Sequence, residues 1–334
     1  MLVLSADEIR ALAPMPRLIE CLREAFRTEC VVPLRQVAKM PGGTGERLFI
    51  SMPAFDLEGR AAVKLVTLVP DNQTKGLPTL QAAIVVFSEM GTPMAILDGT
   101  IVTQLRTGAA SALASTYLSR ADSSHLVIIG TGALAPNMAA AHCAVRPITR
   151  VSVWGRRPER AIGTAAAIRA LVDHDIEVVV PNSIEEAVTK ADIVSCATSS
   201  PTPVLAGKWL RSGAFVDLVG SFSPAKREAD DDVVLRSRIF VDTFEGALAE
   251  AGEILDPLAR GVIGRERIEG DIADLVCGRK GGRISDDEII LFKSVGTAIE
   301  DLAASRLVVA AAIEDPFPSL QDSVGFRKAK SYTS

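Results

Sequence analysis

The spacing of apolar residues along the chain changes character twice. Over residues 9–29, apolar side chains recur every three or four positions behind a capping sequence at 5–8, which predicts a helix that Pro14 and Pro16 divide. From residue 33 to 97, short runs rich in Val, Ile, Leu and Phe stand between Gly and Pro turns, as is typical of strands. The predicted strands are 48–52, 61–68, 81–87 and 93–97, and an Ala-rich helix is predicted over 102–118.

From residue 125 onward, strand patterns alternate with helical ones. Parallel strands need a crossover connection, so this alternation predicts an α/β fold with a parallel, Rossmann-like sheet. Residues 291–313 form one apolar pattern, which we interpret as a single helix that returns to the N-terminal part. We expect a discontinuous α/β domain from 1–118 and about 297–334, and a Rossmann domain at 119–296. The predicted strands are 126–130, 150–154, 177–180, 193–197, 214–219 and 239–241.

The composition narrows the classes of function. Of the 334 residues 48% are hydrophobic and only 4% aromatic, so the apolar mass is aliphatic, as suits helices on a buried parallel sheet. The net charge of −5 is spread along the chain, so we expect a small-molecule ligand and neither nucleic acid nor a membrane as partner. Five scattered cysteines and three histidines predict a reducing compartment and no metal site. Acidic residues occur by residue 8 and no apolar run could span a membrane, so we expect a cytoplasmic protein without a signal peptide. The polar tail at 314–334 is expected to be partly disordered or to lie on a partner.

A glycine-containing turn follows the predicted strand 126–130. It reads Gly-Thr-Gly-Ala-Leu-Ala over residues 130–135 and precedes a helix expected at 134–144. The first glycine permits a tight turn, the second lets the backbone approach a pyrophosphate, and the small third residue lets helix and strand pack closely. The helix N-terminus adds unpaired N–H groups and the positive end of its dipole. This context predicts a dinucleotide site at Gly130, Thr131, Gly132, Ala133 and Leu134.

The second strand of the predicted parallel sheet ends in Gly155, Arg156 and Arg157. An NAD-binding site usually has an acid there for the ribose hydroxyls, whereas two guanidinium groups suit a 2′-phosphate. The sequence therefore favours NADPH, with NADH as the alternative.

Cations in the N-terminal part form a second candidate site. Lys64 stands in an apolar strand, Arg106 in an Ala-rich helix, and Arg35 and Arg47 lie nearby in sequence. Burying a cation without a counter-ion is costly, so such residues are usually paired or functional. A substrate carboxylate, held bidentately by arginine, is one candidate counter-ion. A structural salt bridge and a solvent-reaching surface position are the alternatives.

Several stretches of the chain form a combined pattern. They are Pro-Leu-Arg at 33–35, the strand around Lys64, Asp-Gly at 98–99, Leu-Arg-Thr-Gly-Ala-Ala at 105–110, the glycine turn, and Phe-Lys-Ser-Val-Gly at 292–296. Together they resemble the ornithine cyclodeaminase and mu-crystallin family over nearly the whole chain. The resemblance implies a dimer, with a substrate and dimerisation domain completed by the C-terminal helix and a Rossmann domain in between.

The resemblance implies roles for individual residues. Arg35, Lys64 and Arg106 match substrate-binding positions, Thr79 matches a pocket residue, and Arg47 is a looser match. Lys64 and Arg106 are the catalytic candidates, with Lys64 either donating a proton or holding the carboxylate. The expected cofactor contacts also include Thr107, Lys293, Ala197, Thr198, Ser199, Gly220 and Ser221.

One departure from the cyclodeaminases bears on the substrate. Those enzymes carry an aspartate in the loop after the fifth Rossmann strand, where this chain has Phe222. A phenyl ring cannot accept a proton or hold an ammonium, but it can lie against a substrate ring. The pattern Gly-Ser-Phe-x-Pro-x-x-Arg-Glu-Ala-Asp at 220–230 looks like the family's bacterial imine reductases. These reduce the anionic imino acid Δ1-pyrroline-2-carboxylate, or its six-membered homologue, to L-proline or L-pipecolate.

Two other functions stay open at this point. One is another enzyme of the same family, either a cyclodeaminase that recycles NAD or an amino-acid dehydrogenase. The other is a non-catalytic NADPH-dependent binding protein, since family members also serve as a lens crystallin and a hormone binder. An intact set of Arg35, Lys64 and Arg106 favours catalysis, because a pure binder has no need of all three. The fold alone cannot decide among these functions.

Overall fold

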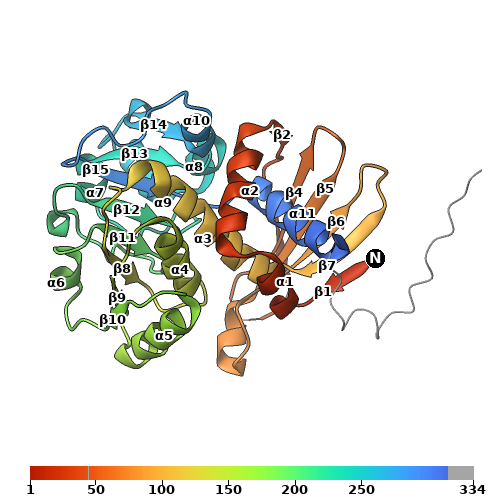
Figure 1. The fold of residues 1–334 in the computed structure, drawn as a ribbon, viewed down its shortest axis with the longest axis horizontal. Helices are drawn as coiled ribbons and strands as arrows, with labels where there is room; N and C mark the ends of the chain where they lie inside the picture. Colours follow the sequence, from red (N-terminus) through yellow and green to blue (C-terminus); the bar gives the residue numbers. More distant parts are fainter. Residues whose placement is uncertain (44, 315–334) are drawn as a thin grey trace, which may run out of the picture.

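The N-terminal lobe is built on a seven-stranded mixed sheet, shown to the right in Figure 1, in the computed structural model of residues 1–43 and 45–314. Its order is β1-β7-β6-β5-β4-β2 with β3 paired to β4, and of these pairs only β1–β7 is parallel. Buried and half-buried side chains alternate along β5, because one face of the sheet is covered. The strands are β1 (Leu2–Leu4), β2 (Cys30–Val31), β3 (Gln36–Met40), β4 (Arg47–Asp56), β5 (Ala61–Leu68), β6 (Leu80–Phe87) and β7 (Pro93–Asp98).

Helices from both ends of the chain pack on this sheet. Helix α11, the last described element, contacts β4, β5 and β6 and lies beside α2 (Figure 1). A capping box between Ser5 and Glu8 starts α1, and Pro14 is the N-cap of α2, so the two prolines divide the first helical region as predicted. The helices are α1 (Ala6–Leu12), α2 (Met15–Arg27), α3 (Gly99–Leu118) and α11 (Ala298–Glu314).

The second lobe holds an eight-stranded sheet that is parallel throughout, as the alternating pattern predicted. Its order is β10-β9-β8-β11-β12-β15-β13-β14, and helices lie between most successive strands. The α/β class with a Rossmann-like sheet is thereby confirmed. The strands are β8 (His125–Ile129), β9 (Arg150–Trp154), β10 (Glu177–Val179), β11 (Ile193–Cys196), β12 (Phe215–Leu218), β13 (Ser237–Val241), β14 (Ile268–Asp271) and β15 (Ile289–Lys293). The helices are α4 (Ala135–Val145), α5 (Pro158–Leu171), α6 (Ile184–Val188), α7 (Asp231–Arg236), α8 (Phe244–Glu250), α9 (Gly252–Ala259) and α10 (Ile272–Val276).

Helix α3 joins the two lobes. Its N-cap Asp98, the last residue of β7, accepts from two backbone N–H groups of the first turn. Further along, a Cβ on Gly108 would lie 2.9 Å from the carbonyl oxygen of Asn137, so α3 and α4 can approach this closely only with glycine there. One turn later the Ser111 hydroxyl donates to Asp217 of β12 at 2.9 Å. The helix is therefore anchored in the second lobe as well as in the first.

The face of the mixed sheet opposite the buried side chains is also apolar. The strand register places Val63 opposite Val85, and Val85 opposite Ile96, on that face. These side chains are half-buried, and Phe49, on the same face, is 38% exposed. An apolar sheet face that stays partly open to solvent is characteristic of a surface that contacts another chain.

The interpretation of residues 291–313 as one helix is wrong. Strand β15 ends at Lys293, a turn with Gly296 at φ +79° follows, and α11 begins only at Ala298. All five residues of β15 are buried between β12 and β13, so the strand has no polar face that would distinguish it from a buried helix. The short strands β1, β2, β3 and β14 were not predicted, and the expected C-terminal tail beyond residue 314 lies outside the described residues.

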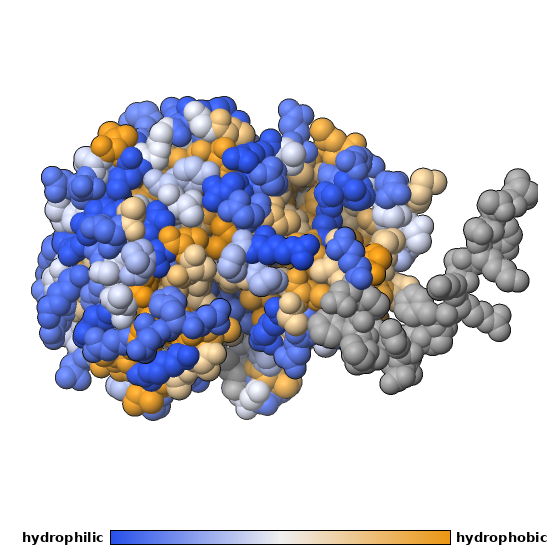
Figure 2. Space-filling view, in the orientation of Figure 1, coloured by the Kyte–Doolittle hydropathy of each residue, from blue (hydrophilic) through white to orange (hydrophobic). Residues whose placement is uncertain are grey.

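The surface shows no dominant apolar region on the face drawn in Figure 2. Hydrophilic side chains spread over both lobes there, with apolar side chains in small groups among them (Figure 2). Among the residues that the structure describes, no helix combines the length and the apolar character needed to cross a membrane.

Candidate functional site

The glycine turn lies between β8 and α4, at the carboxyl edge of the parallel sheet. Gly130 has φ +128°, and a Cβ there would lie 2.4 Å from the carbonyl oxygen of Ala197, so only glycine fits. Gly132 is exposed, and a Cβ there would meet nothing within 4 Å. The turn therefore leaves its second glycine open to a ligand in front of the N-terminus of α4, which is where a pyrophosphate binds in such folds.

The end of β9 lies against this turn. A Cβ on Gly155 would lie 2.5 Å from Cγ2 of Thr131, so these two expected cofactor residues are in contact. Arg156 and Arg157 follow and are exposed, and no described residue forms an ion pair or hydrogen bond with either guanidinium group. Both cations are thus available to an anionic group at the adenosine end of a dinucleotide.

A buried charge cluster fixes the next two loops of the same edge. The Glu228 carboxylate accepts from the backbone N–H groups of Thr198 and Gly220, at 2.7 Å each. Burial raises the pKa of Glu228 to about 7, although Lys293 opposes this. Lys293 is fully buried, donates to the Ser221 carbonyl oxygen at 2.6 Å and pairs with Glu253 at 3.1 Å. The loops after β11 and β12, which contain the expected contacts Ala197, Thr198, Ser199, Gly220 and Ser221, are therefore tied to each other and to β15.

Lys64 and Arg106 meet in the interior between β5, α3 and α11. The Lys64 Nζ lies 2.7 Å from Oδ2 of Asp301, and Arg106 pairs with Glu300 at 2.6 Å and with Asp301 at 3.1 Å. The pKa of Lys64 is lowered to about 8, because burial and the neighbouring Arg106 lower it by more than Asp301 raises it. Burial likewise raises the pKa of Glu300 to about 7 against the effect of Arg106.

This arrangement gives the two cations counter-ions from the protein itself, Asp301 and Glu300 of α11. Lys64 is 2% exposed and Arg106 5% exposed, so the alternative of a solvent-reaching surface position does not apply to them. The structural salt bridge is present, and a substrate carboxylate as an additional partner stays a prediction.

Arg35 occupies a different place, in a pocket between the lobes. The pocket has a volume of about 350 Å³ and lies beside the carboxyl ends of β13 and β15. Arg35 pairs with Glu250 at 2.9 Å and donates to the carbonyl oxygens of Val295 and Gly296 at 3.2 and 2.7 Å. The cavity is lined from the first lobe by residues including Met52 and Arg35, and from the second by residues including Thr243, Gly246 and Glu250.

Four further predicted residues lie outside the lining of this pocket. Thr107 is buried next to Arg106, and Phe222 is 39% exposed in the loop after β12. Arg47 donates to the Pro41 carbonyl oxygen at 3.2 Å near the tip of the β3–β4 hairpin, and Thr79 directly precedes β6. None of these four lines the pocket of Arg35, so the structure does not bring Arg47 together with Arg35.

Sequence reasoning missed the acidic partners. Asp301 and Glu300 stand in the Ala-rich helix α11, and both are buried. The same argument that singled out Lys64 and Arg106, a charge in apolar surroundings, applies to them and could have found them. Glu250 gives no such signal, since it ends a short amphipathic helix far from Arg35 in sequence.

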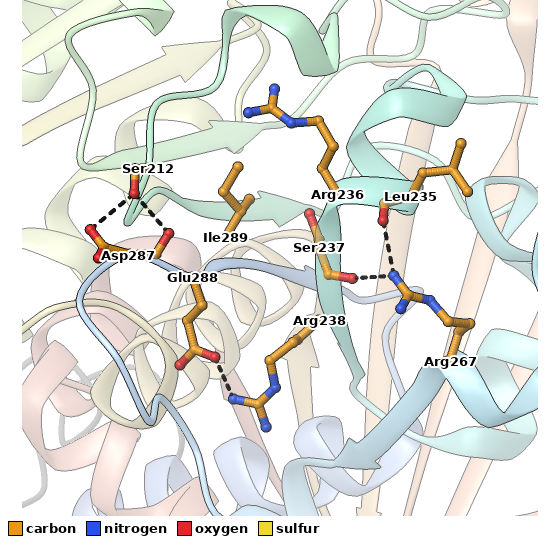
Figure 3. A pocket seen from close by; sticks show the side chains of 9 residues that line it. All are labelled: Ser212, Leu235, Arg236, Ser237, Arg238, Arg267, Asp287, Glu288 and Ile289. Atoms are coloured by element: carbon orange, nitrogen blue, oxygen red, sulfur yellow. Dashed lines mark hydrogen bonds and ion pairs between the residues drawn. The ribbon is translucent and has the colours of Figure 1, made fainter.

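A second pocket, of about 470 Å³, lies at the opposite edge of the parallel sheet (Figure 3). It surrounds Ser237 and Ile289, the first residues of β13 and β15, and three arginines reach it. Arg238 donates to Glu288, and Arg267 donates to the carbonyl oxygens of Leu235 and Ser237 (Figure 3). Ligands of open parallel sheets bind at the carboxyl edge, so the site is at the glycine turn and the Arg35 pocket instead.

Comparison with known proteins gives matches over almost the entire chain. The sequence profile of the ornithine cyclodeaminase/mu-crystallin family matches residues 1–315. A Δ1-pyrroline-2-carboxylate reductase of Colwellia psychrerythraea is 37% identical over 313 residues, which make up 92% of this chain and 98% of that protein. The resemblance noted in the sequence therefore extends through both lobes.

Two solved structures have the same arrangement of lobes. Thermococcus litoralis Δ1-pyrroline-2-carboxylate reductase in complex with NADH and L-proline gives a TM-score of 0.89 at 37% identity, covering 94% of this chain and 98% of that one. An archaeal alanine dehydrogenase dimer with bound NAD gives 0.84 at 33% identity, covering 94% of this chain and 96% of that one. Both neighbours hold a nicotinamide dinucleotide.

Proposed function

Since the chain belongs to the ornithine cyclodeaminase/mu-crystallin family, we propose that it is an NAD(P)H-dependent reductase of Δ1-pyrroline-2-carboxylate that produces L-proline. One structural observation carries the proposal. The glycine turn follows β8, the Arg35 pocket adjoins β15, and the order β8-β11-β12-β15 separates them by three strand spacings, about 14 Å. An extended dinucleotide bound at the turn therefore reaches the pocket with its nicotinamide. The relative and the neighbouring structure named for this reaction support the same substrate.

The residues around the pocket have separate roles in binding the substrate and in proton transfer. Bound NAD(P)H supplies the hydride that adds to the imine carbon, and the protein supplies position and electrostatics. Arg35 is the cation that lines the pocket, so it binds the substrate carboxylate. Arg106 lies behind Gly296 of the pocket lining, where a Cβ would lie 2.6 Å from its Nη1. Lys64 shares the counter-ion Asp301 with it, and Glu300 is the second counter-ion of Arg106. Lys64, whose pKa is about 8, stays the candidate proton donor.

The finer choice of cofactor is NADPH. Arg156 and Arg157 are exposed beside the turn and have no partner among the described residues, which suits a 2′-phosphate. NADH is the alternative, and the neighbour with L-proline contains NADH. The six-membered homologue of the imine, which would yield L-pipecolate, is a second substrate in this proposal.

The assembly that we propose is a homodimer formed through the mixed sheet. Its open face presents Phe49, Val63, Leu65, Val85 and Ile96, and the neighbouring alanine dehydrogenase is a dimer. In this proposal the substrate and dimerisation domain comprises residues 1–118 together with the segment from about 297, and the Rossmann domain comprises 119–296. A cytoplasmic location stays a prediction from the sequence.

The test is NADPH and NADH oxidation by the purified protein with Δ1-pyrroline-2-carboxylate. Turnover should be abolished by Arg35→Ala and nearly unchanged by Arg47→Ala, a matched control because Arg47 lies outside the pocket. Ammonia release from L-ornithine with NAD, or oxidation of L-alanine, would instead identify another enzyme of the family. Dinucleotide binding without turnover of any of these substrates would indicate a binding protein.

A further inference from the structure

An ion pair across the cleft joins two residues with unused hydrogen-bonding capacity. Arg35 precedes β3 in the first lobe, and Glu250 is the last residue of α8 in the second. The Arg35 Nε lies 2.9 Å from Oε1 of Glu250, and its Nη2 donates to the Val295 and Gly296 carbonyl oxygens. Within the described residues, Nη1 of Arg35 has no acceptor. The guanidinium group of Arg35 is thus held through Nε and Nη2, while Nη1 remains available as a donor.

Glu250 has a carboxylate oxygen that lacks a hydrogen-bond donor. Its side chain is 19% exposed, and its Oε2 is buried with no hydrogen-bond donor among the described residues. Burial raises the pKa of Glu250, the nearby Asp242 adds to this, and Arg35 opposes it. A buried carboxylate oxygen without a donor is costly, so a donating ligand group in this pocket would be bound favourably.

We propose that Glu250 is a substrate-binding residue whose Oε2 accepts a hydrogen bond from the cationic ring nitrogen of the ligand, while Arg35 Nη1 donates to the ligand carboxylate. This rests on the proposed function for its substrate class, a cyclic imino acid and the corresponding amino acid. Both groups line the same cavity of about 350 Å³. A pair of opposite charges matches a zwitterion, which carries one charge of each sign.

The charges around the pocket support this assignment. Lys64 and Arg106 already have Asp301 and Glu300 as counter-ions, so they leave little uncompensated positive charge to repel an iminium. Phe222 cannot accept a hydrogen bond, so the loop after β12 offers no side-chain carboxylate at that position. Glu250 supplies one from α8, on the same side of the cleft.

The role of Glu250 is consistent with the electron balance of reduction. Hydride from NAD(P)H forms the new C–H bond at the iminium carbon, the C=N π pair moves to nitrogen, and NAD(P)⁺ remains. The iminium already carries its N–H, so Glu250 has to hold that proton in place and does not have to transfer it. The resulting amine then takes up a proton, for which Lys64 is the candidate donor, and this gives the ammonium form of L-proline.

Two ligands of similar shape separate the charges. L-proline has a carboxylate and a ring ammonium, whereas cyclopentanecarboxylate has the carboxylate alone. In calorimetric titrations with NADP⁺ present, Glu250→Gln should weaken L-proline binding by at least about tenfold and change cyclopentanecarboxylate binding by less than about twofold. Glu245→Gln, an exposed glutamate of α8 that lines the same pocket, should leave both affinities unchanged. Arg35→Ala should weaken both ligands.

The outcomes separate this inference from the proposed function. Equal weakening of both ligands by Glu250→Gln would mean that Glu250 acts only through Arg35, and would overturn the inference, as would unchanged binding of L-proline. If the wild-type protein does not reduce the imine, the proposed function is overturned. NADPH oxidation measures this independently of ligand binding. Thermal melting of each variant shows whether it is folded, and Glu250→Asp, which retains the carboxylate on a shorter side chain, should bind L-proline better than Glu250→Gln does.

Discussion

Replacing Asp301 by Asn probes the buried charge cluster that holds α11 on the first sheet. Asp301 is 1% exposed and contacts Lys64 Nζ at 2.7 Å and Arg106 Nε at 3.1 Å. Removing one partner of a buried ion pair costs about 3–5 kcal/mol, because the remaining charge stays in the interior without its counter-ion. We expect the D301N protein to lose that much free energy of unfolding at pH 7.

Part of this loss should depend on pH, since Lys64 titrates. Its pKa is about 8 in the folded protein, below the usual lysine value, and loss of Asp301 lowers it further. A depressed lysine pKa destabilises the fold most at low pH, where the unfolded chain binds the proton more tightly. At pH 7 this part is limited to about 1.4 kcal/mol, the equivalent of the one unit between pH 7 and the present pKa. At pH 9 Lys64 is largely neutral in both folded proteins, so this part vanishes and the loss at Arg106 remains.

Urea unfolding at pH 7 and pH 9 measures both parts. The matched comparison is Lys64→Met against Lys64→Met/Asp301→Asn, in which Lys64 no longer titrates. Any change of the loss with pH in this pair comes from Glu300, whose pKa of about 7 is raised in part by Asp301. If D301N loses less than about 1 kcal/mol of free energy of unfolding at pH 7, the argument that it leaves buried cations without a counter-ion is refuted. If the D301N loss narrows by pH 9 no more than the loss in the Lys64→Met pair does, the titration of Lys64 is refuted.

Two further predictions concern the cofactor and the assembly. The double variant Arg156→Ala/Arg157→Ala should lower kcat/KM for NADPH by about 10- to 100-fold and leave NADH nearly unaffected, because only NADPH carries a 2′-phosphate. Steady-state kinetics with both cofactors measure this, and equal losses would remove the arginine pair from cofactor choice. Leu65→Glu should convert a dimer into a monomer in light scattering, since it places a charge on the open apolar face of the mixed sheet. Lys75→Glu, at an exposed position, is the control. If Leu65→Glu has the same molar mass in solution as this control, that face is not the interface.

The fold was predictable wherever the pattern of the chain was unambiguous. Alternating strands and helices after residue 125, together with the glycine turn, predicted the parallel sheet and its dinucleotide edge. The pattern failed at β15, because a central strand that is buried on both faces has the same apolar run as a buried helix. Short edge strands such as β1 have too few residues to show any periodicity.

The site was predictable in part for a related reason. Lys64 and Arg106 were found because a charge in an apolar segment needs a partner, but the rule does not say which partner. Asp301 was overlooked because α11 was treated as apolar throughout. The pairing of Arg35 with Glu250 joins two lobes through a loop and a helix end, and such a contact depends on tertiary structure alone.

Helix α3 limits how the cleft can open. Arg106 ties it to α11 in the first lobe, while Gly108 and Ser111 hold it on α4 and β12 in the second. A hinge motion between the lobes would have to bend this helix or break one of those contacts, and a continuous helix resists bending because its hydrogen bonds run along its whole length. The lobes therefore behave as one stiff frame, and the distance from the dinucleotide to the pocket is set when the chain folds. Within such a frame, the Arg35–Glu250 ion pair that crosses the cleft is a preformed pair of charges, so a ligand that contacts both residues meets them at a spacing that folding has already fixed.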